Sequence, residues 1–293
     1  MQTAATVKIN YFFRRFRAFL GKGWVVHKRE IVVSNVDERS PSPIFIIGTH
    51  RSGTSLLRRI IDSHPAIACP PESFFMSHYF SLISDDEASI GFDNLSISHD
   101  SVRQVLASQS SYFHEAYRKA KGKSRWADKT PQYFEYLNEI DQLFAPDVVF
   151  VNIIRNPLDV AYSIWSRKWD VVRKDGDYLD NVCKYVARAG LKQLAFFDQT
   201  SSRYVKLRYE DLVENTRVEL ERVIEVIGEP WCDEIMNFSR IPHDFGTEDP
   251  IVRGTKRIQG STGNWRAWKQ SQLNCAVKNL KDLMIATGYA IPE

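Results

Sequence analysis

The sequence has few cysteines and no long apolar run. Its four cysteines, Cys69, Cys183, Cys232 and Cys275, form no CxxC pair and no Cys/His ligand spacing, which argues against a zinc site and a disulfide framework. No apolar run reaches the roughly 18 residues of a membrane span, and the first residues lack the continuous apolar stretch of a secretory signal. We therefore expect a cytoplasmic protein.

Charge of either sign is not in excess. The chain has 39 Lys plus Arg against 36 Asp plus Glu, a formal net charge of +3. This balance argues against a nucleic-acid partner bound by charge, so any anion site must be local. The acidic residues show no metal-ligand spacing, and no metal is expected. With 293 residues, 43% of them hydrophobic, the chain suits one large α/β domain with appendages.

The N-terminal segment combines aromatic and basic residues. Phe12, Phe16 and Phe19 recur at helical spacing among arginines, which predicts a basic amphipathic helix over residues 10–22. Such a helix either lies peripherally on an anionic membrane surface or packs on the protein's own body, and the sequence leaves both open. A polar stretch ending in Pro-Ser-Pro follows. We expect residues 1–40 to be an appendage with its linker, and residues 41–293 to be a single domain.

Strand and helix patterns alternate through the rest of the chain. Apolar strands are predicted at 44–47, 148–154 and 204–208, and each precedes a helix. The near-continuous apolar content of the first two is typical of strands covered on both faces. This pattern predicts an α/β fold of the P-loop type, a doubly wound parallel sheet with helices on both faces. Residues 74–123 and 170–197 look mainly helical and should cover the sheet's carboxyl edge, where such folds bind ligands.

Two helix ends carry local signals. Pro157 stands where the helix after the second strand should begin. Thr216 and Glu219 have the spacing of a capping box, and Gly228 fits the end of that same helix.

A glycine-containing loop lies between the first strand and its helix. Gly48-Thr-His-Arg-Ser-Gly-Thr-Ser55 places backbone N–H groups and a helix N-terminus where they would converge on an anion. It nearly matches the Walker pattern GxxxxGK[ST], but Thr54 replaces the lysine and the basic residue is Arg51. The second strand ends in Arg155, where a Walker-B strand would end in a magnesium-binding Asp. These departures indicate an anion site built without a metal.

These motifs resemble those of PAPS-dependent sulfotransferases, which use 3′-phosphoadenosine-5′-phosphosulfate. The loop resembles their 5′-phosphosulfate loop, and Arg155-Asn-Pro-Leu-Asp-Val-Ala-Tyr-Ser163 resembles their 3′-phosphate motif. Further similarities, which extend the resemblance over residues 43–268, are Asp128-Lys-Thr-Pro131, Leu207-Arg-Tyr-Glu-Asp-Leu212 and Gly260-Ser-Thr-Gly-Asn-Trp-Arg266.

The resemblance implies PAPS as co-substrate, 3′,5′-ADP as product and no metal. The residues that it assigns to the co-substrate are Arg51, Ser52, Gly53, Thr54 and Ser55 at the 5′ end, Arg155 and Ser163 at the 3′ end, and Tyr209, Trp265 and Arg266 at the adenine or phosphates. Arg167 lies four residues beyond Ser163 on the same expected helix face and would add a third contact at the 3′ end. Trp268 fits the core equally well.

The resemblance also implies the catalytic residues. The segment Cys69-Pro-Pro-Glu72 is similar to the branch that contains tyrosylprotein sulfotransferases and bacterial relatives, which places the general base at Glu72. Lys129, helped by Arg51, would stabilise the charge that develops on the leaving group. His50 and His64 are alternative bases, ranked below Glu72 because a histidine in such a position is more often structural.

The acceptor is left open by the sequence. The segment after Glu72 has Phe74 and His78 where the acidic-peptide enzymes place arginines, so a carbohydrate, lipid or other small-molecule hydroxyl is the expected acceptor. Aromatic residues that fit a stacking pocket, or equally the core, are Phe74, Phe75, Tyr79, Phe80, Tyr112 and Phe113. The alternatives to a sulfotransferase are a P-loop nucleotide or small-molecule kinase and a nucleotide-binding protein without catalysis.

Overall fold

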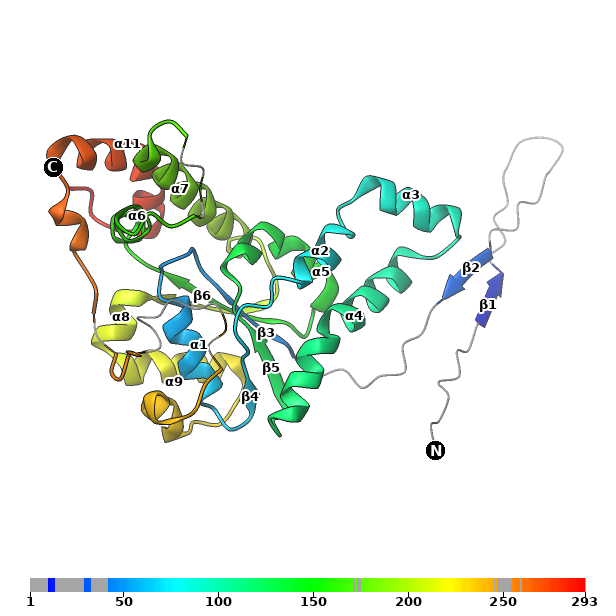
Figure 1. Ribbon diagram of the computed structural model, residues 1–293. Helices are drawn as coiled ribbons and strands as arrows, with labels where there is room; N and C mark the ends of the chain where they lie inside the picture. Colours follow the sequence, from blue (N-terminus) through cyan, green and yellow to red (C-terminus); the bar gives the residue numbers. More distant parts are fainter. Residues whose placement is uncertain are drawn as a thin grey trace.

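The protein is built around a parallel five-stranded sheet (Figure 1). The computed structural model describes residues 10–13, 29–32, 42–170, 172, 175–244, 246, 254–258 and 260–292. The sheet has the order β4-β5-β3-β6-β7, and each neighbouring pair is parallel. Its strands are β3 (Ile44–Ile47), β4 (Ile67–Ala68), β5 (Arg125–Asp128), β6 (Val149–Ile154) and β7 (Arg203–Arg208).

Helices connect these strands. The α-helices are α1 (Thr54–Asp62), α2 (Met76–Ser81), α3 (Asp86–Asn94), α4 (His99–Ala120), α5 (Leu137–Phe144), α6 (Pro157–Ser166), α7 (Tyr178–Phe197), α8 (Tyr209–Glu214), α9 (Thr216–Ile227) and α11 (Gln270–Thr287). The 3-10 helices are η1 (Pro131–Tyr136), η2 (Asp233–Arg240) and η3 (Asn264–Ala267). Among the described residues, no helix combines the length and apolarity of a membrane span.

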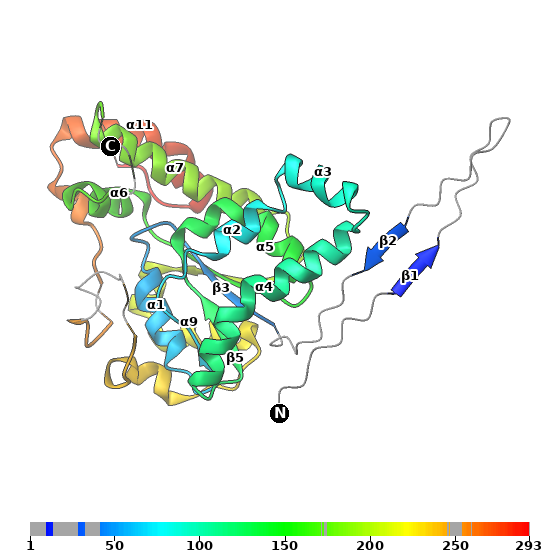
Figure 2. The same ribbon diagram turned by 45° about the vertical axis from the view of Figure 1, so that its right-hand side comes forward.

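The sheet is covered on both faces, as the sequence predicts. Ile44 and Ile46 of β3 belong to a core cluster with residues of α1, α8 and α9, whereas Phe45 and Ile47 belong to a second cluster with α2, α4 and α5. Figures 1 and 2 show these helix groups on opposite sides of the sheet. Alternate strand residues therefore bury in opposite layers, and the doubly wound α/β prediction is confirmed. A third cluster joins α6, α7 and α11.

Two of the three helix-end signals are confirmed. Pro157 is the first residue of α6, and the Asn156 side chain accepts from the Leu158 N–H at 2.9 Å. Gly228 ends α9 with a φ of 83°. The capping box is wrong, because α9 begins at Thr216 itself and the Thr216 hydroxyl instead donates to the Leu212 carbonyl at 2.7 Å.

The helix predicted over residues 10–22 is wrong for residues 10–13, the part of it that the structure describes. Residues Asn10–Phe13 form strand β1, which pairs antiparallel with β2 (Arg29–Val32). The aromatic residues at 11–13 favour a strand as strongly as they fit an amphipathic stripe, and here strand pairing prevails. Residues 14–22 of the expected helix and 34–41 of the linker lie outside the described ranges, so the division at residues 40 and 41 stays a prediction.

Candidate active site

The carboxyl ends of β3, β5 and β6 meet at one edge of the sheet, beside a cavity of about 770 Å³. Its size is that of a typical ligand pocket. The described residues that line it come from separate segments of the chain and are His50, Arg51, Gly53, Thr54, Ser55, Leu56, Glu72, Pro131, Arg155, Ser163, Arg167, Trp169, Tyr209, Gly254, Thr255, Lys256, Arg257, Gly260 and Ser261. Five of these side chains are cationic and one, Glu72, is acidic, so the cavity is suited to an anion.

The loop after β3 is held in a conformation that exposes backbone donors. Gly53 has a φ of 102°, and a Cβ there would lie 2.6 Å from the Tyr209 ring, so only glycine fits. Arg51 also has a left-handed backbone, with a φ of 71°, a strain that is typical of functional sites. Helix α1 begins at Thr54 with no side-chain cap, which leaves its first N–H groups available to an anion.

Not every residue of the loop faces the cavity. Gly53, Thr54 and Ser55 line it. Ser52 is 1% exposed, and its hydroxyl donates to the Thr49 carbonyl at 2.7 Å, so its side chain shapes the loop from within.

Two arginines join the loop to the segment after β6. Arg51 Nε donates to Ser163 Oγ at 3.0 Å, and its guanidinium lies 4.7 Å from the Trp169 ring centre. Arg155 Nη1 donates to the Arg51 carbonyl at 2.8 Å, and its guanidinium lies 4.6 Å from the Tyr209 ring centre. The buried Nε of Arg155 has no hydrogen-bond partner within the described part of the chain. A ligand oxygen at this position would satisfy that donor.

The segment 260–266 is fastened beside this arginine. Asp159, which is 2% exposed, accepts the N–H groups of Gly263 and Asn264 at 2.8 Å each. Arg155 also donates to the Ser261 carbonyl, and Gly260 and Ser261 line the cavity. These contacts hold the segment at the start of α6, so that its first residues close part of the cavity.

Trp265 and Arg266, which the sequence assigned to the co-substrate, lie outside the cavity. Trp265 packs against the core cluster of α6, α7 and α11, and the Arg266 guanidinium lies 4.8 Å from its ring centre. Neither lines the cavity. Trp268 is 7% exposed within the same cluster, which confirms its interpretation as core.

Glu72 and Lys129 form an ion pair beside the loop. Lys129 Nζ lies 2.6 Å from Glu72 Oε1 and donates to Ser55 Oγ at 3.2 Å. Lys129 is completely buried, whereas the Glu72 side chain is 17% exposed and lines the cavity. A buried cation is therefore fixed between the end of the phosphate loop and the carboxylate.

The two histidines have structural partners. His64 Nε2 lies 2.9 Å from the Pro230 carbonyl and Nδ1 accepts the Ala66 N–H, so both ring nitrogens are occupied. His50 lines the cavity, but burial, with Lys129 and Arg51 nearby, lowers its pKa to about 4.

The partner of His50 Nδ1 also weighs against a role as base. Burial raises the pKa of Tyr185 well above its usual value, so its hydroxyl keeps its proton. That hydroxyl lies 2.5 Å from His50 Nδ1, so this ring nitrogen has a partner within the protein.

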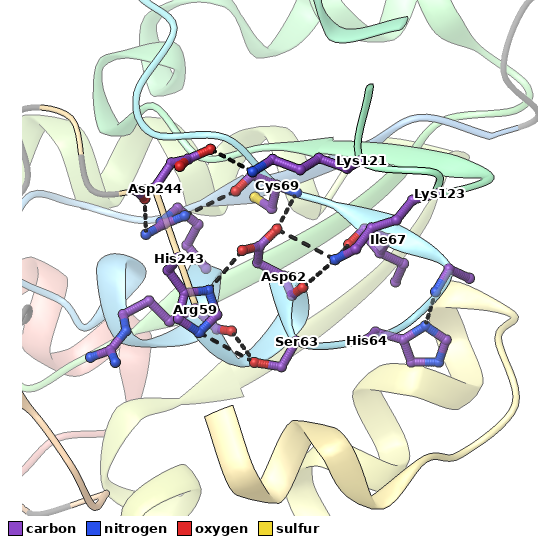
Figure 3. A network of polar contacts seen from close by, with 12 residues as sticks. Arg59, Asp62, Ser63, His64, Ile67, Cys69, Lys121, Lys123, His243 and Asp244 are labelled. Carbon is purple, nitrogen blue, oxygen red and sulfur yellow. Dashed lines mark hydrogen bonds and ion pairs between the residues drawn. The ribbon is translucent and has the colours of Figure 1, made fainter. Parts of the chain in front are cut away.

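A network of polar contacts, shown in Figure 3, holds the chain that leads to Glu72. Asp62 accepts the Cys69 N–H at 2.9 Å and lies 2.7 Å from His243 Nδ1, while Lys123 Nζ donates to the Ile67 carbonyl at 2.8 Å. The network thus joins the end of α1 to β4 and to residues 241–244. Cys69 stands three residues before Glu72, so the network fixes where that segment leaves the sheet.

This network should make stability depend on pH. Burial alone would raise the pKa of Asp62, but hydrogen bonds from His243 and Cys69 hold it below its usual value of 3.8. A group whose pKa is lowered on folding stabilises the protein at pH values above its unfolded-state pKa. This stabilisation is lost as the pH falls through its folded-state pKa. We expect Asp62→Asn to lose about 2 kcal/mol of unfolding free energy at pH 7.

Denaturant unfolding across pH checks this expectation. The difference between wild type and Asp62→Asn should shrink as the pH falls below 3.8. Asp282→Asn, at an exposed position of α11, is the matched control and should match wild type at every pH. A constant difference between wild type and Asp62→Asn down to low pH would contradict the role of the charge.

The sequence interpretation missed one stretch of residues that lines the cavity. Gly254, Thr255, Lys256 and Arg257 line it, yet they follow residues that carry no strand or helix signal. The adjacent basic pair between two glycines was a detectable signal for an anion site. Asp159 was missed too, because it lies within the 3′-phosphate motif but binds protein rather than ligand.

The aromatic residues near Glu72 divide into two groups. Phe80 is fully buried, and Phe75 and Tyr79 pack on the same core cluster. Phe74, Tyr112 and Phe113 are 41%, 61% and 56% exposed. None of the six lines the cavity.

Comparison with known proteins identifies the family. The model described as "Sulfotransferase family" matches residues 43–233, more than half of the chain. The chain belongs to the sulfotransferase family.

Two curated proteins are similar to this chain. Nodulation protein NoeE of Sinorhizobium fredii is 28% identical over 223 residues, which cover 64% of this chain and 51% of that protein. Protein-tyrosine sulfotransferase A of Caenorhabditis elegans is 26% identical over 223 residues, covering 73% and 57%. The chain thus spans little more than half the length of these relatives.

Solved sulfotransferases share the fold. The sulfotransferase domain of the Synechococcus olefin synthase has a TM-score of 0.60 at 19% identity, covering 87% of this chain and 98% of that one. A mouse sulfotransferase complexed with PAP has a TM-score of 0.53 at 15% identity, covering 86% and 88%. This likeness confirms the predicted fold.

Proposed function

We propose that this sulfotransferase moves the sulfuryl group of PAPS onto a hydroxyl group of a glycan, lipid or other small molecule. One observation carries the proposal. A single cavity joins a phosphate loop, a second arginine cluster at the end of β6, and a carboxylate paired with a buried lysine. PAPS has phosphate at both its 3′ and 5′ positions, and the two cationic ends of the cavity match that division.

The two ends would hold the co-substrate as follows. The N–H groups at the start of α1, with the side chains of Thr54 and Ser55, would bind the 5′-phosphosulfate. Arg155, Ser163 and Arg167 would bind the 3′-phosphate, which supplies an acceptor for the unpaired Arg155 Nε. The mouse sulfotransferase of the same fold was solved with PAP, which supports this choice of nucleotide.

The Glu72–Lys129 pair would supply the chemistry. Sulfuryl transfer places negative charge on the oxygen that departs with the phosphate, and a fixed cation there lowers the barrier. Lys129 provides that cation, with Arg51 beside the loop. The acceptor hydroxyl must lose its proton as it attacks, and Glu72, exposed to the cavity, accepts it.

The ion pair between these residues gives the free protein a resting arrangement. Lys129 contacts both Glu72 and Ser55, so a small movement toward Ser55 brings its charge to the phosphosulfate end. The same movement frees the carboxylate for the acceptor. We infer that co-substrate binding readies both groups at once.

The site favours this reaction over phosphoryl transfer by a kinase. Thr54 occupies the position of the Walker lysine, and β6 leads to Arg155 rather than to a magnesium-binding Asp. Arg51 and Arg155 both line the cavity, in positions that suit a nucleotide with a 3′-phosphate.

Binding calorimetry tests the nucleotide assignment. The protein should bind 3′,5′-ADP more tightly than 5′-AMP, because only the former engages the cluster at the end of β6. Arg155→Ala should weaken 3′,5′-ADP binding by about 2 kcal/mol, roughly thirtyfold, while 5′-AMP binding changes by no more than about threefold. Arg217→Ala, on the exposed face of α9, is the control and should bind both as wild type does. Equal affinities of wild type for the two nucleotides would contradict the assignment.

A further inference from the structure

A buried chain of hydrogen bonds lies behind the Glu72–Lys129 pair. The Met76 N–H donates to the Tyr133 hydroxyl at 3.2 Å, which lies 2.8 Å from Ser73 Oγ. Ser73 Oγ donates to Asp128 Oδ2 at 2.6 Å. His114 Nε2 approaches the same oxygen at 2.8 Å. The chain thus runs from Tyr133 through Ser73 and ends on the Asp128 carboxylate.

The Tyr133 phenol can act as a donor in this chain. Burial, with Asp128 nearby, raises the pKa of Tyr133, so its hydroxyl keeps its proton. Since Ser73 donates its only hydroxyl proton to Asp128, its oxygen can accept from Tyr133. Ser73 and His114 both contact the same Asp128 oxygen.

The chain joins the immediate neighbours of both proposed catalytic residues. Ser73 follows Glu72, and Asp128 precedes Lys129. A second bond repeats the connection, because the Ser73 N–H donates to Thr130 Oγ1 at 3.1 Å. The peptide that carries the carboxylate is thus fastened twice to the peptide that carries the cation.

The burial of these polar groups costs folding free energy, so a contribution to stability does not by itself account for them. His114, Asp128 and Tyr133 are each at most 2% exposed. His114 Nδ1 and Asp128 Oδ1 have no hydrogen-bond partner among the described residues. Incompletely satisfied buried polar groups cost free energy, and apolar side chains of similar volume usually stabilise a core at least as well. A role in placing the neighbouring residues accounts for the arrangement.

We propose that Ser73, Asp128 and His114 are positioning residues, which set the separation and orientation of Glu72 and Lys129. This inference rests on the proposed sulfuryl transfer. The three side chains lie outside the cavity wall and touch no substrate. They should therefore govern turnover while leaving nucleotide binding unchanged.

Ser73→Ala is the first test, because it removes one hydroxyl from the middle of the chain. PAPS turnover is measured with a panel of phenols, methyl glycosides and fatty alcohols. The variant should lose about tenfold or more in kcat, since small displacements of catalytic groups cost that much, with an unchanged Kd for 3′,5′-ADP. Ser110→Ala is the matched control, a buried serine of α4 whose hydroxyl donates only within its own helix, and it should keep wild-type kcat.

A double-mutant cycle separates positioning from general destabilisation. If Ser73 acts through Glu72, Ser73→Ala should change turnover by no more than about threefold in a Glu72→Gln background. His114 offers an independent check, since Gln retains a donor toward Asp128. His114→Gln should therefore keep more activity than His114→Phe, which retains only the ring packing on Trp126.

The outcomes divide cleanly. Unchanged kcat in Ser73→Ala overturns the positioning role, and an equal loss with and without Glu72 overturns its action through Glu72; either result leaves the proposed function standing. If His114→Phe does not fold, the serine variants decide alone. Wild-type protein that turns over no PAPS with any acceptor of the panel overturns both proposals.

Discussion

Glu72→Gln is expected to lower PAPS turnover by about a hundredfold or more, the usual scale of a positioned general base. The amide has the shape of the carboxylate but cannot take the acceptor's proton. Its uncharged oxygen can still accept a hydrogen bond from Lys129, so the fold and the affinity for 3′,5′-ADP should be preserved. Steady-state kinetics and calorimetry on the same preparation check both statements.

The acidity of the acceptor provides the control. An acceptor that is already ionised, such as a nitrophenol at alkaline pH, does not need a base, so it should restore much of the lost rate. Glu87→Gln, at an exposed position of α3, should behave as wild type. If Glu72→Gln stays fully active while His50→Ala is inactive, the base has been assigned to the wrong residue.

Lys129→Met is expected to lower turnover by about a hundredfold to a thousandfold, the range measured for the loss of a single group that stabilises transition-state charge. Met keeps the apolar stem in a position that is fully buried, but removes the charge 2.6 Å from Glu72. The defect arises at the leaving group, so an ionised acceptor should not repair it.

The contrast between these two variants is the useful measurement. Rates with a phenol and with a nitrophenol should separate them, because the acidic acceptor restores Glu72→Gln and leaves Lys129→Met slow. Lys129→Arg, which keeps the charge, should retain more activity than Lys129→Met. The same restoration in both variants would contradict separate roles for the two residues.

The central strands were predictable because all of their residues except Asn152 are apolar. Residues 44–47 and 149–153 are buried from both faces, and that burial favours the observed composition. The loop at 48–55 was predictable because its structure requires a particular residue type. Gly53 is required by its backbone conformation and by the adjacent Tyr209 ring.

The other half of the sheet carries no such local signal. Strand β4 has only two residues, and β5 contains charged residues in a fully buried strand. Arg125 is accommodated there because it donates to the Ser42 and Ile227 carbonyls and pairs with Glu229 at 2.9 Å. These partners are distant in sequence, so no pattern within the strand indicates them.

The candidate site shows the same division. The residues of the loop and of the 3′-phosphate motif follow strands that are visible in the sequence. By contrast, Lys129 follows β5, and the stretch Thr255–Arg257 is held beside α1, where Arg59 donates to the Thr255 carbonyl at 3.1 Å. Their place in the cavity depends on long-range packing, and only the family resemblance indicated Lys129 in advance.

Transfer of labelled sulfate tests the central claim most directly. Sulfur-labelled PAPS and γ-phosphate-labelled ATP are each incubated with the protein and the same acceptor panel, with and without magnesium. We predict that label moves from PAPS to at least one hydroxyl acceptor, that chelating the magnesium does not stop it, and that no label moves from ATP. Transfer from ATP that requires magnesium, together with no transfer from PAPS, would contradict the proposed function.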